Sequence, residues 1–223
     1  MLLACGPRSF LPALPARVPP PLAAEGEASR LARTLAPVLY LQRDEPFPLL
    51  RTVAVVDTAR RRIAYHLLWR DDAHGAWLPS TRPTDEEIVW VGYDGSGAPT
   101  DVWTFWHGKI LHLPWDRRTV EIDVQWGKHG SMPRGMRESD LPRLRTLNVF
   151  YLAALLGSPD IALGRLNRYG PWGFFHGYRR YRSFTRPLEV GPRLDAVLRA
   201  SPGVEWGMRA VFGWNYSRKR AWP

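Results

Sequence analysis

Short runs of β-branched and aromatic residues, separated by turn residues, recur along the first two thirds of the chain. We expect strands at residues 52–56, 63–69, 87–93, 101–107, 110–113 and 119–126. The last run alternates between apolar residues at positions 120, 122, 124 and 126 and polar residues between them, which is typical of a strand with two different faces. Strands at this spacing, with turns between them, predict an antiparallel β-sandwich core.

Apolar residues recur at helical spacing on both sides of this predicted core. We expect helices at residues 27–36, where Pro37 ends the pattern, and at 143–156, 160–168, 192–200 and 205–212. The sequence thus predicts a mainly β protein with appended helices (α+β), in which residues 27–223 form a single globular domain. Its β core spans about residues 38–133, and a helical C-terminal region spans about residues 140–223.

The first 26 residues differ from the rest in composition. Six prolines lie between positions 7 and 21, which favours an extended tether over a helix. Before them, Leu2-Leu3-Ala4-Cys5-Gly6 resembles a bacterial lipobox, in which the cysteine becomes lipidated, and we interpret residues 1–26 as a signal remnant and tether. Met1 alone precedes the motif, which a start codon placed too far downstream would explain. We therefore expect a lipid-anchored or secreted protein of the bacterial cell envelope; the alternative is a cytoplasmic protein in which the motif arises by chance.

The chain is strongly basic. Its 223 residues carry a formal net charge of +10, with 28 Arg and 3 Lys against 21 acidic residues. Codon usage in a GC-rich genome explains such an excess of Arg, and so does an anionic partner. Hydrophobic residues make up 45% of the chain, and no apolar run approaches the roughly 18 residues of a membrane span.

A second basic feature is the segment 169–184, which interleaves aromatic residues with Arg. Such a segment suits single-stranded nucleic acid or an anionic membrane surface, because aromatic rings stack on bases and cations neutralise phosphates. The alternative is Arg stacking on aromatic rings within the molecule. The sequence has no helix-turn-helix, zinc-finger or RRM signature, so nucleic acid is the less favoured partner.

A polar cluster at one end of the predicted hairpin 87–107 is the main candidate site. Asp85 and Glu87 point to the same face of a strand, because side chains alternate. With the turn centred on Gly97, Glu87 lies opposite His107, and His129 follows a later strand. The rest of this face is then apolar and consists of Val89, Val91, Tyr93, Trp103 and Phe105.

Two carboxylates with one or two imidazoles favour a divalent cation or an acid–base pair. Carboxylate oxygens suit Ca²⁺ or Mg²⁺, whereas imidazole shifts the preference towards Zn²⁺ or Mn²⁺. In the alternative, Asp85, Glu86 and Glu87 begin the strand as solvated charges, and His107 hydrogen-bonds a turn. Two other histidines are weaker candidates: the loop that contains Asp72 and His74 is typical of a solvated turn, and His66 of a hydrogen-bonded core histidine.

Four segments carry a resemblance to known families. They are Tyr65-His66-Leu67-Leu68-Trp69, Asp85-Glu86-Glu87-Ile88-Val89, Trp103-Thr104-Phe105-Trp106-His107-Gly108 and Gly127-Lys128-His129-Gly130-Ser131-Met132-Pro133. Their order resembles the vacuolar-protein-sorting sixty-two-like family and, more distantly, the necrosis-inducing (NPP-type) proteins, which are β-sandwiches. The resemblance covers about residues 38–133 and leaves out the predicted helical region.

The resemblance implies a set of site residues. Asp85 and Glu87 match the acidic pair that binds a divalent cation in the necrosis-inducing proteins, which use it in engaging membrane sphingolipid. His107 matches the histidine of a His-Gly pair, and His129 matches a later one. Arg82 stands where the motif has a histidine, and a bidentate pairing of Arg82 with the carboxylates is the alternative to metal binding.

Together these observations predict an envelope-associated binding protein with an unknown ligand. Asp85, Glu87, His107 and His129 are its expected metal or polar-ligand site, with Arg82 and Trp106 as ligand contacts. A metal-dependent hydrolase would use the same residues, with a carboxylate as general base. The sequence has no Gly-x-Ser-x-Gly elbow, phosphate loop or dinucleotide fingerprint, so whether the protein is an enzyme stays open, with binding favoured.

Overall fold

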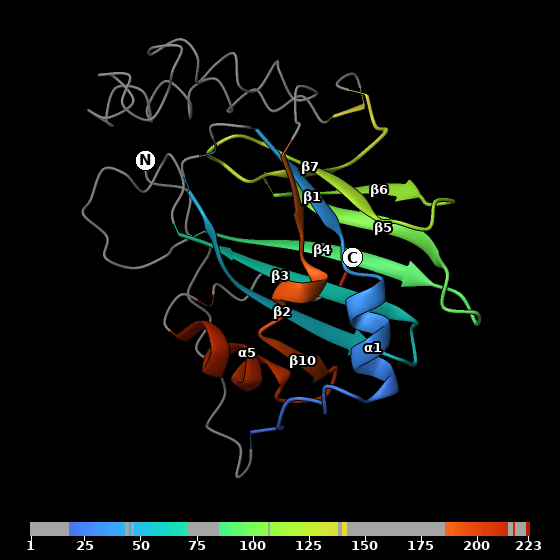
Figure 1. The fold of residues 1–223 in the computed structure, drawn as a ribbon, viewed down its shortest axis with the longest axis vertical. Coiled ribbons are helices and arrows are strands. Elements are labelled where there is room, and N and C mark those ends of the chain that lie inside the picture. Colours follow the sequence, from blue (N-terminus) through green and yellow to red (C-terminus); the bar gives the residue numbers. More distant parts are fainter. Residues whose placement is uncertain are drawn as a thin grey trace.

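Ten strands form two β-sheets in the part of the chain that the structure, a computed structural model, describes (Figure 1). The described residues are 18–42, 45, 47–70, 85–106, 108–137, 140–141, 186–213, 216 and 222–223. The predicted mainly β fold with appended helices is confirmed, because strands dominate and two α-helices accompany them in this part of the chain.

The larger sheet has six strands. In spatial order they are β10 (Ala196–Arg199), β2 (Leu49–Asp57), β3 (Arg62–Trp69), β4 (Asp85–Tyr93), β5 (Pro99–Trp106) and β6 (Lys109–Pro114). Strands β2 to β6 follow one another in the chain and pair antiparallel, as hairpin connections require. All five contain a run that the sequence predicted to be a strand.

The smaller sheet has four strands and lies over the larger one (Figure 1). In spatial order they are β8 (Ser131–Pro133), β7 (Glu121–Val124), β1 (Val38–Leu41) and β9 (Arg186–Glu189). β1 pairs with β7 in parallel, and β10 pairs with β2 in parallel. The predicted antiparallel pairing therefore holds for β2 to β6 but not for these two pairs, which join segments far apart in the chain that hairpin turns do not link.

The main hydrophobic core lies between the two sheets. It includes Leu39, Ile122, Tyr65, Val89 and Val91, each fully or almost fully buried. Helix α1 (Glu27–Thr34) closes one side of this core, where the Tyr65 hydroxyl donates a hydrogen bond of 2.8 Å to the Ala32 carbonyl.

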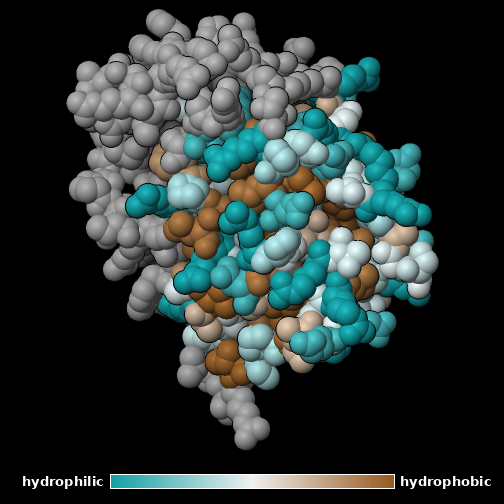
Figure 2. Space-filling view, viewed as in Figure 1, coloured by the Kyte–Doolittle hydropathy of each residue, from teal (hydrophilic) through white to brown (hydrophobic). Residues whose placement is uncertain are grey.

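A second apolar cluster covers the outer face of the larger sheet. It joins Val53, Val55, Ile88 and Trp90 to helix α5 (Val204–Phe212), and α5 packs on β10 and β2. Among the described residues, the only large hydrophobic side chains classed as exposed are Val18 and Leu50. Hydrophilic residues accordingly cover much of the described surface in Figure 2, with smaller apolar areas between them.

The structure tests three of the five predicted helices. Those expected at 27–36 and 205–212 are confirmed as α1 and α5. The helix expected at 192–200 is wrong: this segment holds a 3-10 turn, η3 (Gly191–Arg193), followed by β10. Pairing beside β2 overrides the local helical spacing there. The helices expected at 143–156 and 160–168 lie outside the described residues.

The described end of the predicted tether contacts the domain. The Leu22 amide donates a hydrogen bond of 2.7 Å to the Val197 carbonyl of β10, and its side chain packs against the main core. Residues 18–26 thus run along the domain before α1 begins. In the described part of the chain, no helix has the length and apolar character needed to cross a membrane.

The register of β4 and β5 differs from the predicted one by one residue. Val89 lies opposite Thr104, and Val91 lies opposite Val102. Tyr93 lies opposite Pro99, so the turn is centred on Ser96, and an irregularity between Gly92 and Tyr93 then shifts the rest of the strand by one residue. Because a slip of one residue exchanges the faces of a strand, the expected placement of Trp103 and Phe105 beside Val89 is wrong, and both pack instead against the outer cluster.

Candidate functional site

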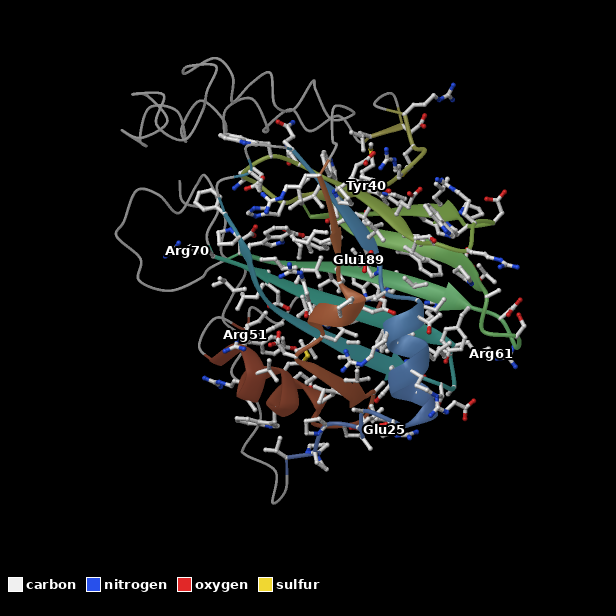
Figure 3. All side chains as sticks on the ribbon, in the orientation of Figure 1. Glu25, Tyr40, Arg51, Arg61, Arg70 and Glu189 are labelled. Carbon is white, nitrogen blue, oxygen red and sulfur yellow. The ribbon has the colours of Figure 1, made fainter. Side chains whose placement is uncertain are left out.

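The start of β4 lies at the end of the sandwich where β3 finishes, near the labelled Arg70 in Figure 3. Asp85 is the first residue of β4 and lies opposite Trp69, the last residue of β3. Alternation places Asp85 and Glu87 on the inner face, with Val89, whereas Glu86 is on the outer face. The predicted shared face of Asp85 and Glu87 agrees with this arrangement.

His129 reaches the same end from the turn between β7 and β8. Its backbone has a left-handed conformation, with φ of 52°, and its amide donates a 3.0 Å hydrogen bond to the Gln125 carbonyl. The Gln125 amide in turn donates a 2.9 Å bond to the Gly130 carbonyl, which closes the turn. This tight turn directs the imidazole into the sandwich, where it has no exposed surface.

Two carboxylates hold the imidazole of His129, one at each ring nitrogen. Nδ1 lies 2.5 Å from Asp85 Oδ2, and Nε2 lies 3.2 Å from Glu45 Oε1. Glu45 is itself fixed, because its Oε2 accepts a 2.9 Å hydrogen bond from the Gly127 amide and its Oε1 accepts one of 3.1 Å from the Phe47 amide. We call Glu45, Asp85 and His129 the acid–imidazole cluster.

Aromatic rings enclose this cluster. The indole of Trp69 stacks on the imidazole of His129 with ring centroids 4.1 Å apart and planes 2° from parallel. The ring of Phe47 meets the same imidazole edge-on, with 6.0 Å between centroids. These apolar walls keep water away and strengthen the charge interactions of the cluster.

The acid–imidazole cluster holds a charged histidine at neutral pH. Burial on its own lowers the pKa of His129. The negative charge of Glu45 and the hydrogen bonds with Asp85 and Glu45 act in the opposite direction and prevail, so that the pKa is raised from 6.5 to about 9. With a proton on each nitrogen, the imidazolium donates to both carboxylates.

Two features distinguish the cluster and the indole that stacks on it. The Asp85 side chain is 12% exposed, whereas those of His129 and Glu45 are 0% and 2% exposed, so Asp85 is the member that reaches the surface. The indole Nε1–H of Trp69 is buried and has no hydrogen-bond partner in the part of the chain that the structure describes. The cluster thus has a partly exposed carboxylate, and the neighbouring Trp69 has a buried donor without an acceptor among the described residues.

On the outer face, Glu86 binds a second histidine. Its Oε1 lies 2.8 Å from His66 Nδ1, and the His66 and Glu86 side chains are 3% and 0% exposed. The prediction that His66 is a hydrogen-bonded core histidine is confirmed. The alternative in which Asp85, Glu86 and Glu87 are solvated charges is wrong, because Glu86 and Glu87 are buried and Asp85 is bonded to His129.

Of the remaining predicted site residues, the structure describes Trp106. Trp106 is fully buried and packs with Leu111, Met132 and Leu141, away from solvent. The remaining predicted features lie outside the described residues; they are His107, Arg82, Cys5, the loop with Asp72 and His74, and the segment 169–184.

The described residues do not fit a metal centre. Asp85 and Glu45 lie at different ring nitrogens of His129, so the three side chains do not point at a common position. No group of three or more His, Cys, Asp or Glu side chains suited to a metal ion occurs within the described ranges. Because His107 lies outside them, the metal site formed by Asp85, Glu87, His107 and His129 stays a prediction, as does the hydrolase that depends on it.

Sequence reasoning missed two members of the site environment. Glu45 comes from the connection between β1 and β2, 84 positions before His129, and no motif links the two. Trp69 was assigned to a strand and to one of the segments that carry the family resemblance, but not to the site. Glu45 lies in a polar run that separates two apolar segments near the start of the predicted core. This position is the feature of the sequence that points to it.

Comparison with known proteins gives distant structural similarity alone. No protein-family model and no curated protein matches the chain. One similar solved structure is NLPPya, a necrosis- and ethylene-inducing peptide 1-like protein, in complex with glucosamine; it has a TM-score of 0.37 and 17% identity, over 56% of this chain and 74% of that one. The complex of NLPPya with mannosamine has a TM-score of 0.36 and 15% identity, over 64% and 96% of the two chains. The resemblance to the vacuolar-protein-sorting sixty-two-like family stays a prediction.

Proposed function

We propose that the chain is a β-sandwich binding protein that captures a small polar molecule carrying an ammonium group, at the acid–imidazole cluster. The observation that carries this proposal is the surplus of carboxylate around His129. Asp85 and Glu45 share one imidazolium, and Glu87 enters the same face two residues further along β4. The three side chains of the acid–imidazole cluster alone carry one formal negative charge, because two carboxylates face one imidazolium.

The geometry supports an ammonium group over other ligands. Asp85 shares the His129 imidazolium with Glu45, so a cation that arrives at the partly exposed Asp85 would gain a charge-assisted hydrogen bond. The buried Nε1–H of Trp69 calls for an acceptor such as a hydroxyl oxygen. A molecule with both an ammonium and hydroxyl groups, such as an amino sugar, satisfies both requirements.

The test is isothermal titration calorimetry on the full chain. Glucosamine and ethanolamine serve as ammonium probes, with glucose and ethylene glycol as uncharged counterparts. We expect the ammonium probes to bind and the counterparts to give no heat. Asp85→Asn keeps the shape of the side chain and should abolish binding. Asp101→Asn is the matched control, because Asp101 holds His112 at 2.8 Å on the outer face and both side chains are partly exposed.

Three results would overturn the proposal. They are a lack of heat with both ammonium probes, equal binding of a probe and its uncharged counterpart, and unchanged binding in Asp85→Asn. A divalent-cation arm with Ca²⁺, Mg²⁺, Mn²⁺ and Zn²⁺, together with elemental analysis, separates the metal alternative. Stoichiometric metal that is lost in Asp85→Ala/Glu87→Ala would establish a metal site in place of the ammonium site.

The proposal places this binding protein at the bacterial envelope, attached through Cys5. Its support is the lipobox-like Leu2-Leu3-Ala4-Cys5-Gly6 and the Pro-rich segment after it. A tether of this kind would join the domain where Leu22 bonds to β10. Such an arrangement keeps the acid–imidazole cluster in solution and close to the membrane.

A further inference from the structure

The first two residues of β4 bind histidines on opposite faces of the same sheet. Asp85 bonds His129 on the inner face, at 2.5 Å, and Glu86 bonds His66 on the outer face, at 2.8 Å. All four side chains are buried or nearly so, with exposed fractions of 12%, 0%, 0% and 3% for Asp85, His129, Glu86 and His66. One short segment therefore holds two carboxylate–imidazole bonds that point in opposite directions.

The outer bond ties β4 to β3 at a particular register. His66 lies directly opposite Ile88, and Glu86 lies opposite Leu68, so Glu86 and His66 are diagonal neighbours on one face. A slip of β4 by one residue would turn Glu86 inwards and Asp85 outwards, and would break both bonds. Apolar residues alone would not select the register as strongly, because residues 88 to 91 are apolar and buried on both faces.

We infer that Glu86 and His66 form a positioning pair that fixes the start of β4 so that Asp85 points inwards to His129. As far as Asp85 contacts a ligand, this inference rests on the proposed function. The pair lies among Val53, Leu68 and Ile88, which belong to or border the outer apolar cluster. In that setting a carboxylate turned away from His66 would lose a hydrogen bond of 2.8 Å, so the paired arrangement is favoured.

The neighbouring charged residues on this face, Arg51 and Asp195, bond to each other. Arg51 lies opposite Leu68 on the far side of β3, but its guanidinium bonds Asp195 at 3.0 Å and is largely exposed. Asp195 also accepts a 2.7 Å hydrogen bond from the Thr52 amide, which holds it at the β2 edge.

The test follows the His129 imidazole proton by NMR without any ligand. An imidazole N–H bonded to a buried carboxylate gives a downfield signal that exchanges slowly with water, which reports on Asp85. We expect Glu86→Ala to remove or shift this signal and to speed amide exchange at 85–87 by at least about tenfold. Glu86→Gln should restore the signal in part, because its amide oxygen still accepts a hydrogen bond from His66.

The control for general destabilisation is Val55→Ala. Val55 is 4% exposed and belongs to the outer cluster. It lies on β2, opposite Ala64 of β3, and is therefore not paired with the start of β4. Its loss should lower global stability and leave the His129 signal in place. An unchanged signal and unchanged local exchange in Glu86→Ala, or the same change in Val55→Ala as in Glu86→Ala, would overturn the inference.

The two proposals fail in different ways. If the probes do not bind the wild-type protein while Glu86→Ala still displaces the His129 signal, the proposed function is wrong and the positioning pair stands. If the probes bind and Glu86→Ala leaves both the signal and the affinity unchanged, the positioning pair is wrong and the binding site stands.

Discussion

Raising the pH from 6.5 to about 9 should weaken the folded protein, because in this interval the unfolded chain has released the His129 proton that the folded state still binds. The folded state binds this proton more tightly than the unfolded chain, whose histidine has the ordinary pKa of 6.5. The stability that the imidazolium contributes is therefore fully present below pH 6.5 and is lost as the pH rises through about 9. Paired carboxylates have the opposite effect, because the stability that they contribute is lost as the pH falls.

The size of the effect follows from the difference between the two pKa values. One pKa unit corresponds to about 1.4 kcal/mol. A folded value of about 9 against 6.5 therefore gives a loss of about 3 kcal/mol in the free energy of unfolding. Because small domains are stable by about 5–15 kcal/mol, a loss of this size should be plainly visible.

The assay is urea unfolding followed by tryptophan fluorescence at several pH values between 6 and 9.5. The upper limit stays below the ordinary tyrosine pKa of about 10, and burial raises the pKa of Tyr65 well above that value. His129→Asn is the control: asparagine does not titrate, and it tolerates the left-handed backbone at φ of 52° better than most residues do. The variant should be less stable at pH 6.5 and nearly independent of pH up to 9.5.

Two outcomes would refute the reasoning. A wild-type free energy of unfolding that stays constant from pH 6.5 to 9.5 would show that His129 is not held as an imidazolium. A fall of the same size in His129→Asn would assign the pH dependence to other groups.

Two further predictions concern the β5–β8 contact and the N-terminus. The buried Thr104 hydroxyl donates a 2.6 Å hydrogen bond to the Ser131 carbonyl, so Thr104→Val should lower the free energy of unfolding by about 1–2 kcal/mol in urea unfolding, whereas Thr104→Ser should retain most of it. In a bacterial host, mass spectrometry of the mature protein should find a lipidated Cys5 as the first residue, and Cys5→Ala should move the protein out of the membrane fraction. An unmodified Cys5 that is still preceded by Met1 would contradict the envelope proposal.

The hairpins of the larger sheet could be predicted because their signals are local. In the β4–β5 turn, Asp94 accepts hydrogen bonds from the amides of Ser96 and Ala98, at 2.8 and 3.0 Å. Such turn chemistry is readable from a short stretch of sequence, as are the apolar runs on either side. The helices α1 and α5 have similarly local signals, namely amphipathic spacing and a Gly or Pro near the end.

The elements that escaped prediction depend on partners far away in the chain. β1 is a four-residue strand that pairs with both β7 and β9, and β10 is strand only because β2 offers it an edge. The register of β4 against β5 failed for a related reason. One irregularity between Gly92 and Tyr93 exchanges the faces of Trp103 and Phe105, and symmetry about a turn does not reveal it.

The candidate site divides in the same way. The sequence predicted that Asp85 and His129 belong to one site, and in the structure Asp85 Oδ2 lies 2.5 Å from His129 Nδ1. Glu45 was missed, because its role depends on the path of the chain between β1 and β2. A carboxylate there has no sequence pattern of its own, whereas alternation along β4 gives the direction of Asp85 and Glu87 directly.

The burial of so many ionisable groups at one end of the sandwich favours binding over a purely structural role. Replacing a buried ion pair by apolar residues of similar volume is often neutral or stabilising, so stability alone does not account for Glu45, Asp85 and His129. The same end also contains Trp69, whose buried indole N–H has no acceptor in the part of the chain described here. A purely structural cluster would satisfy its own donors and balance its own charges. The proposed binding of a polar cationic ligand at Asp85 would supply the positive charge that Glu45, Asp85 and His129 lack among themselves.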